Sequence, residues 1–96
     1  MPKPRKKKEP KVHPNRQWCV DQTGNDETTL FADGFDDCII GVEHGICGRV
    51  VYDKQMMVEE LMSQGMDECE AIEYLEFNTW GAYVGDQTPL YIYVRS

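Results

Sequence analysis

Clustered carboxylates are the first feature of the chain that could do chemistry. The segment "ADGFDD" places Asp33, Asp36 and Asp37 within five positions, and Glu43 follows a short apolar run. Such oxygens suit a hard divalent cation, and two-metal phosphoryl chemistry uses them. However, the segment lacks the alternate acids and bidentate Glu of a calcium helix–loop–helix, and Asp-Gly is a strong turn signal. The pattern favours a turn with solvated acids, with a metal site as the alternative.

A second polar stretch, "EFNTWGAYVGDQTP", follows a predicted helix. Glu76 and Asn78 are two residues apart, so on a helix they point in different directions and cannot form a pair. We expect Asn78 to hold the loop that leads to Pro89, because a buried amide needs partners. Trp80 and Tyr83, with the valine that follows, are expected to close the core. The glycines expected to end the helix and make the next turn are Gly81 and Gly85.

Other catalytic patterns are missing from the sequence. It contains no G-x-S-x-G, P-loop or G-x-G-x-x-G motif. The four cysteines form no Cys-x-x-Cys pair, so a zinc site is disfavoured. No secretory signal is expected, because no apolar stretch follows the basic N-terminal residues, and reduced thiols are therefore expected rather than disulfides. These observations favour a protein that is not an enzyme and that needs no metal or other cofactor. The four cysteines are Cys19, Cys38, Cys47 and Cys69.

The charge of the chain is divided between its two parts. Residues 1–17 are basic and rich in proline, which predicts a disordered tail. Such a tail can bind nucleic acid without sequence specificity, or fold back on the acidic remainder, residues 18–96, which carry sixteen carboxylates against three cations. The basic residues of the tail are Lys3, Arg5, Lys6, Lys7, Lys8, Lys11 and Arg16.

The remainder of the chain predicts one α+β domain over residues 18–96. Two β-rich runs, 38–43 and 46–52, read as a hairpin. Helices are expected over 54–64, capped by Asp53, and from Asp67 to about Thr79, where Asp67 opens a capping box. An alternating strand follows Pro89. The expected fold is a three-stranded antiparallel sheet with two helices on one face, in the order strand, strand, helix, helix, strand, with the last strand beside the first.

The last strand predicts which residues face the core. Leu90, Ile92 and Val94 alternate with Tyr91 and Tyr93, so the aliphatic set is expected to meet the helices and the tyrosines to lie on the open face. That face suggests a protein partner or a weak homodimer, a cover formed by residues 18–31, or base stacking with nucleic acid. The candidate binding residues of the chain are Asp33, Asp36, Asp37, Glu43, Glu76, Tyr91 and Tyr93.

Three segments together carry a family resemblance: "ADGFDDCIIGV", "VVYDKQMMVEELMSQGMDECEAIEYLEFN" and "GAYVGDQTPLYI". Over roughly residues 32–93 the chain resembles a group of small proteins encoded by tailed bacteriophages. The resemblance implies a phage source and the host cytoplasm, and it implies no mechanism.

Three hypotheses about function follow from the charge and the motifs. The first is a non-enzymatic accessory protein whose acidic domain binds a host or phage protein, in its sharper form by mimicking nucleic acid. The second is a metal-dependent nucleotide or phosphoester enzyme built on the "DGFDD" acids and Glu76. The third is nucleic-acid binding through the basic tail. No apolar run reaches the length of a membrane span, so no membrane partner is expected.

Overall fold

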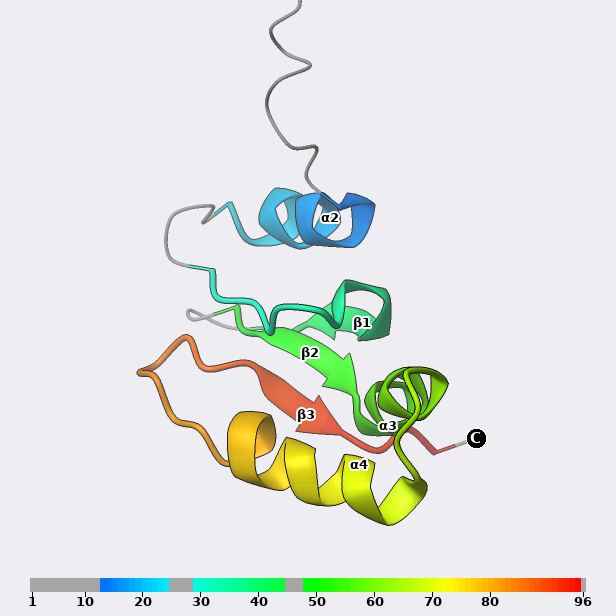
Figure 1. The fold of residues 1–96 in the computed structure, drawn as a ribbon. Coiled ribbons are helices and arrows are strands. Elements are labelled where there is room, and N and C mark those ends of the chain that lie inside the picture. The colour runs from blue at the N-terminus through cyan, green and yellow to red at the C-terminus, as the bar shows by residue number, and fades with distance from the viewer. Residues whose placement is uncertain (1–12, 25–28, 45–47, 96) are drawn as a thin grey trace, which may run out of the picture.

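A computed structural model describes residues 13–24, 29–44 and 48–95. The chain forms an α+β fold around a three-stranded sheet (Figure 1). Its elements in order are α2 (Pro14–Thr23), the 3-10 turn η1 (Asp36–Cys38), β1 (Ile39–Val42), β2 (Val50–Asp53), α3 (Lys54–Ser63), α4 (Glu68–Leu75), the π-helical segment η2 (Glu76–Trp80) and β3 (Leu90–Ile92).

The sheet is mixed, with the strand order β1-β2-β3. β1 and β2 pair antiparallel, as the predicted hairpin requires, but β2 and β3 pair in parallel. The expected all-antiparallel sheet, with the last strand beside the first, is therefore wrong. Parallel neighbours need a long crossover connection, and α3, α4 and η2 supply it between β2 and β3. The predicted order of strand, strand, helix, helix, strand is confirmed in this part of the chain.

The ends of the two crossover helices follow the local sequence signals. The Asp53 carboxylate accepts hydrogen bonds from two backbone N–H groups in the first turn of α3. Gly65 has φ +111°, and its N–H and that of Met66 bond back to carbonyls of the last turn, which closes α3 in a Schellman arrangement. Asp67 and Glu70 form the predicted reciprocal capping box at the start of α4. The predicted caps at Asp53 and Asp67 are confirmed.

Helix α2 begins inside the segment assigned to the basic tail from sequence. Pro14 occupies the first turn, where its missing N–H is tolerated, and the His13 imidazole Nδ1 accepts the Asn15 N–H at 3.1 Å. Residues 14–17 are therefore helical, whereas residues 1–12 of the predicted tail lie outside the described part of the chain. Cys19 anchors α2, because its side chain is fully buried in the core.

The core lies on the face of the sheet that carries Val50 and Tyr52. Tyr52 is fully buried and stacks on Tyr91 of the neighbouring strand, with ring centroids 5.5 Å apart. Tyr52 and Tyr91 are paired in the parallel register, so both rings lie on the same side of the sheet. The other fully buried side chains include Met57, Val58 and Leu75 from the crossover helices.

The predicted facing of the last strand is therefore reversed. Tyr91 packs against the core, whereas Ile92 and Val94 are 42% and 51% exposed. Leu90 pairs with Val51 on the opposite face of the sheet. The register with β2 decides this, because a strand that places Tyr91 beside Tyr52 must turn Leu90 and Ile92 the other way. The open face is thus aliphatic and not a platform of tyrosines.

Two truncations in β3 test this facing. We expect Tyr91→Ala to lower the free energy of unfolding by about 2–3 kcal/mol, since it removes a ring packed on Tyr52. Ile92→Ala, on the open face, is expected to lower it by about 1 kcal/mol or less. Urea unfolding followed by circular dichroism measures both. A larger loss of unfolding free energy for Ile92→Ala would instead support the facing expected from sequence, with Ile92 toward the core.

Candidate binding cleft

The "DGFDD" segment is held against the sheet by backbone contacts. The Ala32 N–H donates to the Tyr52 hydroxyl at 2.7 Å, and this bond fixes the segment over β2. The buried Phe35 and its N–H bond to the Ala32 carbonyl shape the turn that follows. The carboxylates of the segment thus project from a backbone whose position is set by the core.

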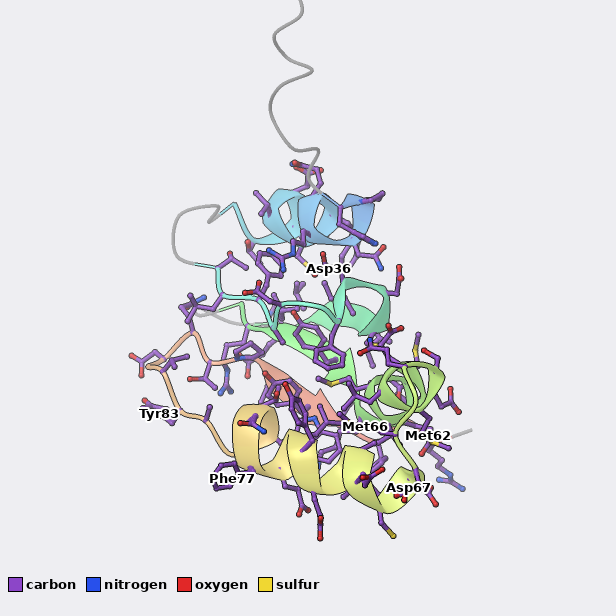
Figure 2. All side chains as sticks on the ribbon, viewed as in Figure 1. Asp36, Met62, Met66, Asp67, Phe77 and Tyr83 are labelled. Carbon is purple, nitrogen blue, oxygen red and sulfur yellow. The ribbon has the colours of Figure 1, made fainter. Side chains whose placement is uncertain are left out.

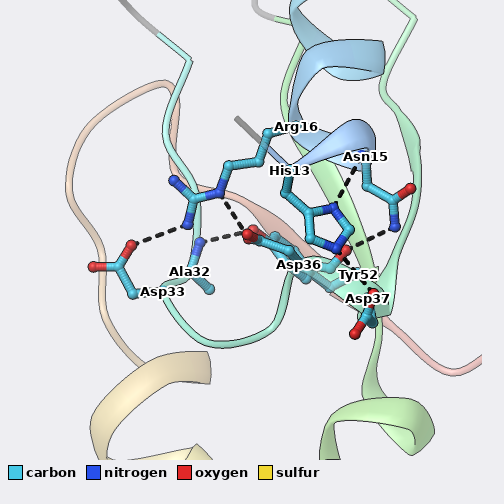
Figure 3. A network of polar contacts seen from close by, with 8 residues as sticks. All are labelled: His13, Asn15, Arg16, Ala32, Asp33, Asp36, Asp37 and Tyr52. Atoms are coloured by element: carbon cyan, nitrogen blue, oxygen red, sulfur yellow. Dashed lines mark hydrogen bonds and ion pairs between the residues drawn. The ribbon is translucent and has the colours of Figure 1, made fainter. Parts of the chain in front are cut away.

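The three carboxylates of the segment contact two residues at the start of α2. The Arg16 guanidinium donates to Asp36 at 2.7 Å and to Asp33 at 3.1 Å, and the His13 ring lies 3.0 Å from Asp37. Figure 3 shows Asp33 and Asp37 on opposite sides of Asp36. The acids therefore fasten α2 to the loop. Among the described residues, no three His, Cys, Asp or Glu side chains are placed to hold a metal ion.

Arg16, predicted to belong to a nucleic-acid-binding tail, is engaged within the domain. Burial alone would lower the pKa of its guanidinium, but the bonds and charges of Asp36 and Asp33 raise that pKa. The same group lies 4.7 Å from the centroid of the Phe31 ring. Arg16 thus sits between an aromatic ring and two carboxylates.

Glu43, another predicted binding residue, is also paired. Its two carboxylate oxygens accept hydrogen bonds of 2.9 and 2.7 Å from Arg49, the bidentate arrangement that arginine favours. These bonds hold the pKa of Glu43 below its ordinary value. Glu43 braces the β1–β2 hairpin and lies outside the cleft.

The second polar stretch forms a π-helical end to α4 and then a loop. Asn78 is exposed and donates to the Tyr74 carbonyl at 3.0 Å, so the prediction that it holds the loop to Pro89 is wrong. A polar side chain on a helix can bond to the backbone carbonyl four residues earlier, which lies closer to it than a distant loop does. Gly81 does end the helix, but with φ −89°; a Cβ there would lie 2.8 Å from the Glu76 carbonyl oxygen. Close backbone approach explains this glycine.

The aromatic residues of the stretch divide between core and solvent. Trp80 packs against the core as predicted, and its indole N–H donates to the Met57 sulfur at 3.4 Å. Tyr83 is 75% exposed and the following valine 62%, so the expectation that they close the core is wrong. The Lys54 ammonium lies 4.5 Å from the Trp80 ring and 5.0 Å from that of Tyr93. Tyr93, a predicted binding residue, is thus engaged with Trp80 and Lys54.

The loop before β3 is closed by one hydroxyl. Thr88 Oγ1 accepts the Val84 N–H at 2.8 Å and donates to the Gly85 carbonyl at 2.6 Å. Gly85 has φ +110°, a conformation that favours glycine, which confirms its turn role. Pro89 is buried at the entrance to β3.

The two polar stretches meet in a cleft of about 370 Å³. Asp33 comes from the first stretch, Asn78 from the second, and Tyr91 from β3. Burial raises the pKa of the Tyr91 hydroxyl, which stays a neutral donor. Glu76, predicted to act with the acids, does not line this cleft. The lining residues are Leu30, Phe31, Ala32, Asp33, Phe35, Asn78, Thr79, Ala82, Val84, Thr88, Pro89 and Tyr91.

Comparison with known proteins gives no relative to interpret the cleft. No protein-family model matches the chain. No curated protein matches it, and no solved structure does. In the described part of the chain, no helix is long and apolar enough to cross a membrane. The cleft has to be interpreted from its own chemistry.

The acid–base contacts to α2 predict a difference between two neighbouring aspartates. Asp36→Ala removes the closest partner of Arg16 at a site where both side chains are about three-quarters buried (exposures of 23% and 27%). We expect it to cost about 1–2 kcal/mol of unfolding free energy and to speed hydrogen exchange in α2. Asp37→Ala removes the same charge at a side chain that is 83% exposed, and should cost about 0.5 kcal/mol or less. Equal losses would contradict the assigned role of Asp36.

The described cysteines predict selective alkylation. Cys19, Cys38 and Cys69 are free thiols, and only Cys69 is exposed. Burial, helped by nearby carboxylates, raises the pKa of Cys38 to about 11, and burial raises that of Cys19. Iodoacetamide at about pH 8 should modify Cys69 first and the buried pair only after unfolding. Peptide mass spectrometry reads each site, and rapid alkylation of Cys38 in the folded protein would contradict its burial.

Proposed function

We propose that the chain is a non-enzymatic bacteriophage accessory protein that binds a basic surface of a host or phage protein in the host cytoplasm. The contact surface is an acidic ridge along one side of α4 and η2. The phage source and the compartment rest on the sequence resemblance alone. The ridge consists of Glu70, Glu73, Tyr74, Glu76 and Phe77.

The observation that carries the proposal is the exposure of Phe77. Its side chain is 87% exposed, and Tyr74, one turn earlier, is 44% exposed. Figure 2 shows Phe77 and Tyr83 at one end of the molecule and Met62 at the other. A phenylalanine in water costs solvation free energy, and exposed aromatic residues are enriched among those that dominate protein interfaces.

The charge around this aromatic pair is one-sided. From Asp53 to Asp86, both included, the sequence has nine acidic residues and a single cation, Lys54. The Lys54 ammonium lies over the Trp80 ring. The ion pairs seen among the described residues all lie outside this stretch. None of the ion pairs seen in the described part of the chain therefore neutralises these acids. A surface of this kind speeds association with a basic partner and repels phosphate.

The two alternative functions have less support. The Asp33 and Asp36 carboxylates are paired with Arg16, and Asp37 lies against the His13 ring, which does not favour a metal-dependent enzyme on these acids. Nucleic-acid binding is a second proposal, carried by the six cations of residues 1–12, which lie outside the described part of the chain. Deletion of that segment, with retention on DNA as the measurement, separates this proposal from binding by the ridge.

Affinity capture from a host lysate tests the ridge. The wild-type chain should retain a basic protein at about 0.1 M salt and lose most of it at about 0.5 M, because exposed charges are screened. Phe77→Ala should weaken binding of that protein about tenfold or more. Ile92→Ala, an exposed aliphatic truncation on the sheet face, is the matched control and should bind as wild type. If capture of the protein depends neither on the salt concentration nor on Phe77, the ridge is not the contact surface.

A further inference from the structure

We propose that the cleft between residues 30–35 and 78–91 receives an arginine side chain, with an apolar neighbour, from an extended segment of the protein partner. The inference rests on the proposed function, because it specifies one contact of the basic partner. It adds a second site, distinct from the ridge, at which the partner is recognised by side-chain chemistry and not by net charge.

The size and walls of the cleft suit a side chain of this kind. Its volume of about 370 Å³ lies at the small end of the range for ligand pockets, which is about 300–1,000 Å³. Phe31, Phe35 and Tyr91 supply aromatic surface, and Val84 and Pro89 supply aliphatic surface. These walls can hold the methylene stem of arginine or a leucine beside it.

The electrostatics of the lining select a cation. Among the described residues, Asp33 is the one charged residue that lines the cleft, and its side chain is 97% exposed at the rim. Its Oδ1 accepts a hydrogen bond from Arg16, and no bond to its Oδ2 is seen within the described residues. A guanidinium would gain a charge-assisted hydrogen bond to this carboxylate, whereas a phosphate or carboxylate would gain no bond from it and would meet its charge, which Arg16 offsets in part.

Arg16 already binds within the domain in the way that we propose for the partner's arginine. The guanidinium of Arg16 lies over the Phe31 ring at 4.7 Å and bonds to Asp33 and Asp36. Figure 3 shows the second side of Asp33 directed away from the rest of this network. Phe31, Phe35 and Tyr91 line the same cleft as Asp33. Arginine fits better than lysine, because a planar guanidinium can both stack and bond.

The cleft and the ridge can contact the same partner. Asn78 and Thr79, which line the cleft, follow Phe77 directly in η2. Val84 lines the cleft and is 62% exposed, and its neighbour Tyr83 is 75% exposed. A partner segment that seats an arginine by Asp33 thus meets further exposed apolar surface at the rim, which explains why these two residues do not enter the core.

Short peptides and NMR on the full-length chain test the inference. The probes are acetyl-Leu-Arg-Leu-amide, its lysine analogue and its glutamate analogue. We expect the arginine peptide to shift backbone amides of residues 30–35 and 78–91 with a Kd on the order of a millimolar. The lysine peptide should bind more weakly and the glutamate peptide should cause no shift. Equal binding of all three would overturn the proposal, because it would show an apolar site without charge selection.

Variants assign the contacts. Asp33→Asn should weaken the arginine peptide about fivefold, while Glu73→Gln, which removes a charge on the ridge, should leave its Kd unchanged. Ala82→Trp fills the cleft from an exposed position and should abolish binding without shifts in α2 or β1. If neither Asp33→Asn nor Ala82→Trp changes peptide binding, the proposal is overturned. Amide shifts in the cleft that depend on protein concentration without peptide would also overturn it and assign the cleft to a second copy.

The two proposals fail in different ways. Phe77→Ala should not change peptide binding, although it should weaken capture of the whole partner. If the peptide binds the cleft but no basic protein is captured, the ridge proposal fails and the cleft proposal stands. If a partner is captured through Phe77 and Ala82→Trp neither reduces that capture nor alters peptide shifts, the cleft proposal fails alone.

Discussion

The buried side chain of Tyr52 connects the parts of this small domain. Its ring is fully buried and stacks on Tyr91, and its hydroxyl accepts the Ala32 N–H. Burial raises the pKa of this hydroxyl, so it remains a neutral phenol. Across the other edge of β2, Ile39 is its antiparallel neighbour. Tyr52, which belongs to the central strand, therefore has neighbours on both flanking strands and on the segment that carries the acids.

The position of the cleft follows from these contacts. The bond from Tyr52 fixes residues 31–35 over the sheet, and the stack with Tyr91 fixes the start of β3. Between them a gap remains, which η2 and the Thr88-closed loop border on the other side. The Ala32 N–H is bonded to the Tyr52 hydroxyl and not to an acid of the loop. Those acids are left to bind α2, through Arg16 and His13.

Much of the local structure was predictable from sequence, because its causes lie within a few residues. Asp53, Gly65 and the Asp67–Glu70 box each act on backbone groups of the same turn. Helix α2 carried a similar signal, Pro14 after a residue able to cap, but its weak apolar periodicity and its basic neighbours concealed it. The basic composition of the chain up to residue 17 therefore predicts a tail there.

The contacts between distant residues were not predictable in this way. Alternation along residues 90–95 gives two faces, and hydrophobicity alone predicts that the aliphatic face packs against the core. The choice reverses because Tyr91 gains a stack with Tyr52, some forty positions earlier in the chain. The cleft has the same origin. Phe31 and Tyr91 line it together, yet nothing in either local sequence indicates the other. Asp33 was a candidate from its residue type, but its aromatic surroundings come only from the fold.

The size of the chain explains why so much apolar surface remains outside the core. A domain of this length buries roughly 60% or slightly more of its unfolded surface, and its helices cover one face of the sheet. Exposed aliphatic residues such as Ile40 and Ile92 on the other face follow from that limit alone. Phe77 does not, because a helix position can be polar at no cost to the fold. A large aromatic residue at 87% exposure, in an acidic stretch whose single cation is Lys54, is not explained by the stability of the fold, and this is the ground for the binding proposal.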